Sequence, residues 1–365
     1  MEDRSVANVG VVLAGFALTA AALPWGTPGV GPVENVALAV LAGVALGAFS
    51  LRRHGLLARR SGSLAAGIAS LGVVSYTGIA TAGTLAGGSG SMSSVWGPTL
   101  ALVGGLGGVI AAYGDGRGLP ESLGQAVKAT GWSLAVGFAG LFAIAVWSSV
   151  LISVLSGLLP GNPGTASQLA VGALGLGLGT GSIALIYFQW TEKTAAYLDF
   201  RVPTKRDVGY IVGGVVAIFG LQMLISVVFS QLGVQTASHS VQQAASGGNA
   251  EVLLLMIPAS WLIIGPGEEL LYRNIIQKEL YGTFGGWGAV LVGSFVFSLA
   301  HIPAYAAGAT TVAALVSTLG VILSLSLVLG TTYHLTTNTT VAALVHGTYD
   351  AVVFGAMYVQ MAGMA

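Results

Sequence analysis

Long apolar stretches recur along almost the whole chain, and they restrict the folds open to it more than any other feature. Each is long enough to cross roughly 30 Å of hydrocarbon as a helix. Eleven can be drawn, at residues 6–24, 33–51, 62–85, 96–113, 132–158, 167–189, 208–230, 251–280, 284–304, 310–334 and 340–362. Because a chain in lipid must satisfy its own backbone hydrogen bonds, the sequence predicts an all-α polytopic membrane protein with about 11 transmembrane helices.

The composition agrees with this fold class and excludes several functions. Only 7% of residues are charged and 54% are hydrophobic, whereas soluble domains carry roughly 25% charge. Glycine supplies 56 of 365 residues, as is typical where membrane helices pack closely. The net charge is zero and no basic stripe is visible, so no nucleic-acid partner is expected. Cysteine is absent, which excludes thiol catalysis and thiolate metal sites.

The lysine and arginine residues give an orientation. Eleven spans divide the connecting loops between two sides, and all 13 basic residues fall on one of them: Arg4, Arg52, Arg53, Arg59, Arg60, Arg117, Lys128, Lys193, Arg201, Lys205, Arg206, Arg273 and Lys278. The positive-inside rule places that side in the cytoplasm. We therefore expect a multi-pass protein of the cell membrane, with its N-terminus cytoplasmic and its C-terminus outside.

The distribution of polar residues divides the chain in two. The first four apolar stretches hold no ionisable residue in their interiors, and a polar stretch at 114–131 follows them. We predict an accessory region at 1–130, which serves packing, lateral gating or partner contact, and a functional region at 131–365. Four glycines of the accessory region, Gly104, Gly105, Gly107 and Gly108, suit close helix packing.

Three polar sites interrupt the last apolar stretches. The first reads G-P-G-E-E-L-L-Y-R-N-I from Gly265 to Ile275, the second F-S-L-A-H from Phe297 to His301, and the third H-G-T-Y-D from His346 to Asp350. Charged groups within a bilayer are costly and are therefore candidates for function. The alternative is that they only hold helices together.

Their spacing predicts a common site. The midpoint between Glu268 and His301 falls in a glycine-rich turn, so two antiparallel helices would bring them to the same depth. Glu269 and Arg273 are four residues apart, which favours a helical ion pair and leaves Glu268 on another face. His346 and Asp350 are also four residues apart and share a face.

We expect Glu268, His301, His346 and Asp350 to line one polar cavity that opens toward the cytoplasm, because the turn at 336–339 lies only seven residues before His346. Glu269 and Arg273 are expected to be structural partners. Phe297 is interpreted as packing, and Tyr272 as either a hydrogen-bonding residue of the site or an interfacial aromatic. His239 lies in a loop and is expected to be solvated. His334 is interpreted as an interface residue.

Other intramembrane chemistries fit less well. A G-G-S-G sequence at 87–90 resembles the nucleophile loop of a rhomboid-type serine protease, but its Gly/Ser composition is typical of a flexible loop. Asp350 has no second aspartate in a glycine-flanked membrane motif, as an aspartyl protease requires. No H-E-x-x-H zinc helix occurs.

Together the motifs E-E-x-x-x-R, F-x-x-x-H and H-x-x-x-D resemble the signature motifs of the CPBP family, the CAAX prenyl endopeptidases and bacteriocin-processing (Abi-type) intramembrane proteases. The resemblance covers roughly residues 130–365. The last motif commonly ends in Asn in the family, whereas here it ends in Asp350. An aspartate can accept a hydrogen bond or, when protonated, donate one.

The resemblance implies hydrolysis of a peptide bond in a membrane-associated peptide or protein substrate, in or beside the lipid bilayer. Glu268 and His301 would activate a water, His346 and Asp350 would stabilise the oxyanion, and Arg273 would fix Glu269. A metal mechanism stays open, with a divalent ion such as zinc held by Glu268, His301 and His346. A non-catalytic receptor or scaffold of the same fold and a proton-coupled transporter are the alternatives. The substrate, prenylated or not, is left open.

Overall fold

The structure is a computed structural model that describes residues 5–23, 32–85, 96–118, 121–158, 163–246, 250–306 and 308–363. Within these ranges all regular secondary structure is helical and no strand occurs. The chain forms two compact units, which are described separately. Unit 1 comprises residues 1–125 with 309–315, and unit 2 comprises 126–308 with 316–365. The G-G-S-G sequence at 87–90 lies outside the described residues.

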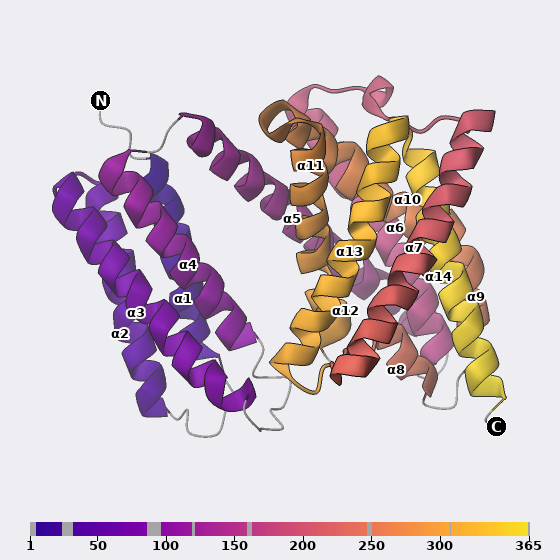
Figure 1. Cartoon of the computed structure of the whole chain (residues 1–365), viewed down its shortest axis with the longest axis horizontal. Coiled ribbons are helices and arrows are strands. Elements are labelled where there is room, and N and C mark those ends of the chain that lie inside the picture. The colour runs from indigo at the N-terminus through magenta and orange to yellow at the C-terminus, as the bar shows by residue number, and fades with distance from the viewer. Residues whose placement is uncertain are drawn as a thin grey trace. The chain divides into compact units, whose positions relative to one another are not determined.

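Unit 1 contains four long helices, α1 (Ser5–Ala22), α2 (Pro32–Arg53), α3 (Arg59–Leu85) and α4 (Trp96–Arg117), which pack side by side (Figure 1). Its buried core consists mostly of alanines around Phe49. A side chain at Gly104 would meet the backbone of α1, and one at Gly108 would meet Ser70 of α3. The prediction that these glycines serve close helix packing is confirmed.

A buried ion pair also ties unit 1 together. Arg52 Nε donates to Asp115 Oδ2 at 2.9 Å, and both side chains are almost fully enclosed. Arg59 donates to the backbone oxygen of Asp115. The sequence analysis placed Arg52 in a loop; instead it lies in the last turn of α2, buried against α4.

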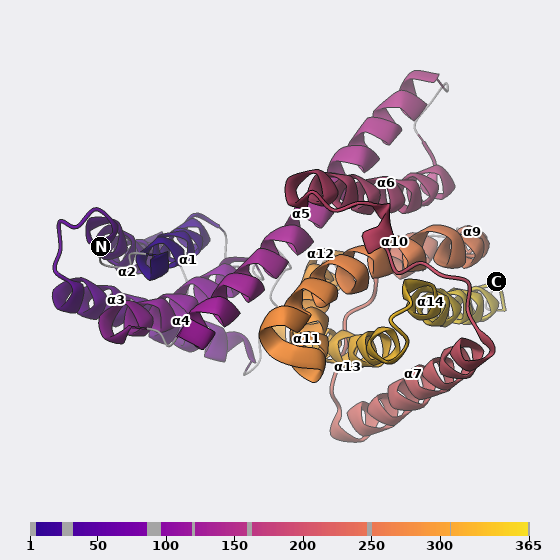
Figure 2. The same cartoon turned by 90° about the horizontal axis from the view of Figure 1, so that it is seen from above.

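Unit 2 holds the remaining elements (Figures 1 and 2). They are α5 (Glu121–Leu158, which begins just before the unit), α6 (Thr165–Thr191), the short 3-10 turn η2 (Ala195–Tyr197), α7 (Lys205–Leu232), α8 (Ser240–Ser246), α9 (Val252–Ala259), the π-helical segment η3 (Ser260–Ile264), α10 (Gly265–Glu269), the π-helical segment η4 (Leu270–Gln277), α11 (Lys278–Ala300), α12 (Ile302–Ala306), α13 (Val312–Thr336) and α14 (Thr339–Ala362). Figure 2 shows α5 and α7 on opposite sides of this unit.

Eight helical ranges in the described part of the chain are long and apolar enough to cross a membrane. The protein is therefore an integral membrane protein with an all-helical fold. One of the eight, Val252–Ala300, contains two of the stretches expected from the sequence, and the first expected span is a shorter apolar helix, Val6–Ala22. The count of eleven and the orientation of the termini stay predictions.

The range Val252–Ala300 is not one straight rod. Gly285 has φ +66° and ψ −172°, a conformation that favours glycine, and the helical geometry breaks there. On either side the chain runs antiparallel, because a Cβ placed on Gly293 would lie 3.3 Å from Cβ of Gln277. The hairpin predicted around the glycine-rich turn is confirmed, and it brings Glu268 level with His301.

Candidate active site

The first polar site lies where one helix changes its geometry twice. The short α10 carries Glu268 and Glu269 and is flanked by the π-helical segments η3 and η4. Such wide turns are rare and occur frequently at functional sites. Pro258, two residues before η3, lacks the N–H that an uninterrupted α-helix needs. The widened turns redirect the side chains of α10 relative to a regular helix.

Glu269 and Arg273 form an ion pair that is completely buried. Arg273 Nε donates to Glu269 Oε2 at 2.9 Å, and Arg273 Nη2 donates to Ser326 Oγ of α13 at 2.9 Å. The other carboxylate oxygen, Glu269 Oε1, lies 2.9 Å from Nδ1 of His346 on α14. The pair expected from the sequence spacing is present, and it joins three helices.

Glu268 faces the two histidines and has a free oxygen. Its Oε2 lies 3.8 Å from Nε2 of His301 and 3.8 Å from Nε2 of His346. That oxygen is buried and has no hydrogen-bond partner among the described residues. His346 Nε2 also lies 3.5 Å from Asp350 Oδ2. The structure thus brings together all six residues singled out from the sequence.

The hydrogen bonds of the two histidines determine which nitrogen faces the site. His301 Nδ1 lies 2.8 Å from the carbonyl oxygen of Phe297. A carbonyl can only accept, so Nδ1 carries the proton and Nε2 presents a lone pair to Glu268 in the neutral ring. Glu269 accepts the Nδ1 proton of His346 in the same way, which directs Nε2 of His346 toward Glu268 and Asp350.

Phe297 is the packing centre between the polar residues. Its ring contacts His301 at 4.3 Å between centroids, lies edge-on to Tyr272 at 4.9 Å, and sits 5.0 Å from the guanidinium carbon of Arg273. This agrees with the packing role expected for it. Tyr272 is buried in the core, so the interfacial interpretation of that residue is wrong.

Two glycines let the helices that carry these residues cross closely. A Cβ on Gly347, the residue after His346, would lie 2.7 Å from the backbone oxygen of Ser260. A Cβ on Gly265 would lie 2.7 Å from the backbone oxygen of Ala343. Any side chain at this crossing would force α14 away from α10, and with it His346 from Glu269.

A cavity of about 410 Å³ adjoins the site. Four of its lining residues are Glu268, His301, His346 and Asp350, and most of the rest are apolar. It is also lined by the first turns of α6, the start of α8, and Met357 near the end of α14. The cavity extends toward the end of the unit that bears α8, away from the lysine- and arginine-bearing connections near which the sequence analysis expected it to open. Which of these two ends faces the cytoplasm stays a prediction. The turn at 336–339 does not line it.

One comparison with known proteins finds a family match over the segment that carries the site. Residues 250–352 match the family model described as Rce1-like, Type II CAAX prenyl endopeptidase Rce1-like. Residues 250–352 are a CPBP-family domain. All three polar sites lie within the match. No curated protein and no solved structure matches the chain.

The cavity also has lining residues outside the matched range that the sequence did not predict. His239, expected to be solvated, packs edge-on against Tyr305 with ring centroids 4.9 Å apart, and both residues line the cavity. Burial, and then the neighbouring His301 imidazole, lowers the pKa of His239 to about 4, so its ring is neutral at pH 7. Nothing in the sequence near 239 indicates this contact, because it depends on how the α7–α8 connection folds back.

The spacing of the potential ligand atoms differs from that of a tetrahedral metal site. Glu268 Oε2 lies 3.8 Å from Nε2 of His301 and 3.8 Å from Nε2 of His346. Ligand atoms around tetrahedral zinc lie roughly 3.3 Å apart, given metal–ligand distances near 2.0–2.1 Å. In the described part of the chain, no group of three or more histidine or carboxylate side chains is arranged to hold a metal ion. The set as folded does not fit a resident metal.

Proposed function

We propose that this protein is an intramembrane endopeptidase of the CAAX-protease (CPBP) type, which hydrolyses a peptide bond in a membrane-associated substrate with a water activated by Glu268 and His301. The observation that carries the proposal is the buried, unpartnered Oε2 of Glu268, 3.8 Å from an imidazole nitrogen on each side. A water 2.7–2.8 Å from both Glu268 and His301 fits this spacing, because hydrogen bonds of that length can converge on one oxygen.

In this mechanism Glu268 acts as the general base. The water donates one proton toward Glu268 and directs the other toward the lone pair of His301 Nε2, so that its oxygen faces the substrate carbonyl. Glu268 takes the proton as the oxygen attacks the carbonyl carbon, and a tetrahedral intermediate forms. When the C–N bond breaks, Glu268 returns that proton to the leaving nitrogen. The products are a new carboxyl group and a new amine.

His346 and Asp350 flank the position where the carbonyl oxygen becomes negative. A doubly protonated His346 donates from Nε2 to this oxyanion, while its Nδ1 proton stays with Glu269. Asp350 lies 3.5 Å from the same Nε2. It either orients the histidine as an acceptor or, when protonated, donates to the oxyanion itself.

Glu269 and Arg273 are positioning residues. Neither reaches the attacking water in this mechanism. The pair holds His346 through Glu269 Oε1 and holds α13 through Ser326. The apolar contacts of Phe297 keep Arg273 and His301 in register.

The decisive test compares two glutamate substitutions on one helix. Glu268→Gln removes the base but keeps the shape, so cleavage of a quenched fluorescent membrane peptide by purified protein should fall by about 10²–10⁴-fold. Glu251→Gln, at the exposed start of α9, should retain the activity of the unaltered protein. If Glu268→Gln is folded and cleaves normally, the mechanism is wrong. If the unaltered protein cleaves no membrane peptide, the receptor or transporter alternative gains.

Metal dependence is tested separately. Prolonged treatment with 1,10-phenanthroline, followed by removal of the chelator, should leave the rate unchanged, because the donor atoms do not match a zinc geometry. Loss of activity that added zinc restores would replace the glutamate-water mechanism with a metal-bound water. A control with the non-chelating 1,7-isomer separates chelation from nonspecific inhibition.

A further inference from the structure

The two ends of unit 2 differ in charge. One end, called here the basic end, consists of the α6–α7 connection, the η4–α11 junction and the α13–α14 turn, and it lies at the top in Figure 1. It bears Lys193, Arg201, Lys205, Arg206 and Lys278. At the opposite end, called here the α8 end, the described residues (163–172, 226–246, 250–255, 302–306, 308 and 355–363) include no lysine or arginine. The positive-inside rule assigns the basic end to the cytoplasm.

The basic end is closed over the catalytic helix. The α6–α7 connection lies across it, where the backbone N–H of Asp199 donates to Asn274 Oδ1 at 2.7 Å. The Asp199 carboxylate accepts from Lys278 at 2.7 Å and from the Tyr333 hydroxyl at 2.6 Å. Asn274 and Gln277, just beyond Arg273, are fully buried. A substrate arriving from this end would have to break this network to reach Glu268.

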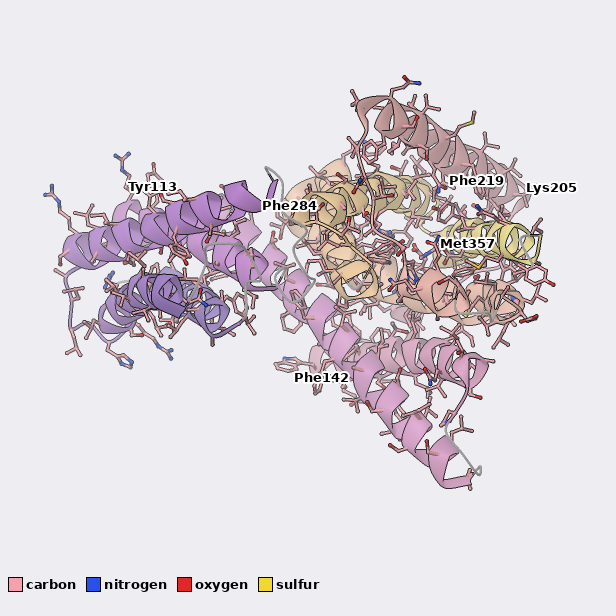
Figure 3. The ribbon with its side chains drawn as sticks, turned by 90° about the horizontal axis from the view of Figure 1, so that it is seen from below. Tyr113, Phe142, Lys205, Phe219, Phe284 and Met357 are labelled. Carbon is pink, nitrogen blue, oxygen red and sulfur yellow. The ribbon has the colours of Figure 1, made fainter. Side chains whose placement is uncertain are left out.

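The cavity extends from the catalytic residues toward the α8 end. From Glu268 it passes Thr180 and Tyr272 and reaches Leu169 of α6, Ser240 of α8 and Met357 of α14, all near the α8 end. Figure 3 views unit 2 from that end, with Met357 marked. Most of its lining between the catalytic groups and the α8 end is apolar, and no lysine or arginine lines it. It therefore suits an uncharged apolar segment. The His346 imidazolium of the proposed mechanism is already flanked by the carboxylates of Glu269 and Asp350.

We propose, building on the peptidase function above, that the substrate enters from the extracytoplasmic side and is an internal apolar segment of a membrane protein exposed there. A prenylated cytoplasmic C-terminus would approach from the closed basic end, and its terminal carboxylate would meet the carboxyl groups of Glu268 and Asp350, which already flank His346. The sidedness thus narrows the substrate class: the cut falls within a chain, on the outer half of the bilayer.

The absence of cysteine allows a direct test, because single cysteines can be introduced without removing any. Ser240→Cys places a thiol at the α8 end on the cavity wall, and Val202→Cys places one at the basic end, where the side chain is 89% exposed. In intact cells a membrane-impermeant maleimide should label Ser240→Cys, and it should label Val202→Cys only after permeabilisation. The reverse pattern would overturn the proposal. This arm does not depend on catalysis.

A second arm tests the route in detergent-purified protein. A bulky maleimide on Ser240→Cys should lower cleavage of a quenched fluorescent peptide of alternating leucine and alanine, with both ends blocked, by at least tenfold relative to the same variant before labelling. The same reagent on Val202→Cys should leave the rate unchanged. Unaltered cleavage after labelling of Ser240→Cys would exclude this route. Cleavage by neither variant before labelling would count against the peptidase function, while the cell-labelling result would still decide the sidedness.

Discussion

In the described part of the chain, each unit has a deeply buried arginine–carboxylate pair, and the two pairs have different roles. In unit 1, Arg52 and Asp115 meet at 2.9 Å at the ends of α2 and α4, within a bundle whose core is mostly alanine. In unit 2, Arg273 and Glu269 meet at the same distance, but Glu269 also accepts a hydrogen bond from His346. His346 in turn faces Glu268 and the cavity. A buried charge alone therefore does not indicate chemistry.

The pair in unit 2 differs because, through His346, it lies next to Glu268 Oε2, a buried oxygen beside the cavity that has no hydrogen-bond partner among the described residues. A buried ion pair rarely gains net stability over apolar packing, although breaking it by removing one partner is costly. In unit 1 the pair positions two helices. In unit 2 the same kind of pair positions a histidine beside a carboxylate that is not itself paired, and this is the arrangement that general-base chemistry needs.

Removing each arginine in turn tests whether the two ion pairs have different roles. Arg52→Ala and Arg273→Ala each remove the arginine partner of a buried carboxylate, so each should lower the free energy of unfolding by about 3–5 kcal/mol. Only Arg273→Ala should also abolish cleavage per folded molecule, because Glu269 then no longer holds His346 in place. The folded fraction is measured by size-exclusion chromatography, and activity is normalised to it.

Two results would contradict the distinction between the pairs. Normal cleavage and normal thermal stability in Arg273→Ala would show that the pair positions nothing. Equal loss of activity per folded molecule in Arg52→Ala would show that unit 1 contributes to the chemistry. Arg273→Lys is a useful further variant, because it keeps the charge but not the fork that reaches both Glu269 and Ser326.

A smaller effect is expected at the helix crossing. Gly347→Ala puts a methyl group 2.7 Å from the Ser260 backbone oxygen, which should cost about 1–3 kcal/mol of stability and shift His346 enough to lower the rate at least tenfold. Gly355→Ala, two turns further along α14, meets only Ile257 at an ordinary 3.8 Å and should behave like the unaltered protein. Equal cleavage rates for the two variants would show that the close helix crossing at Gly347 does not position His346.

Much of the site could be predicted from the sequence because its parts are local or symmetric about a turn. Glu269 and Arg273 pair at helical spacing, and the depth match of Glu268 and His301 needs only the position of Gly285. The helical fold itself follows from the requirement that a chain in lipid satisfy its own backbone. These features depend on few long-range contacts.

The other features of the site depend on contacts between residues far apart in the sequence, which the spacing of motifs does not predict. The π-helical turns around α10 lie beside its close crossing with α14, a contact between segments far apart in the sequence. The turn at 336–339 suggested a cytoplasmic opening, yet Thr339 and Asp199 close that end through backbone hydrogen bonding. His239 reaches the cavity because the chain after α7 folds back toward Tyr305. Arg52 is buried because Asp115, 63 residues away, receives it.

The smallest expected effect comes from removing most of unit 1. A chain that begins at Gly131 lacks α1–α4 and keeps all six residues of the candidate site, together with Ser326 and the cavity lining. It also begins in the polar stretch assigned to the cytoplasm, so the predicted orientation of the remaining helices is preserved. We expect cleavage within about tenfold of the full chain, and a lower melting temperature. Cysteine labelling at position 240 confirms insertion before the rates are compared. If that shortened chain inserts and folds but cleaves nothing that the full chain cleaves, the first unit is not accessory, and its ion pair belongs to the catalytic apparatus after all.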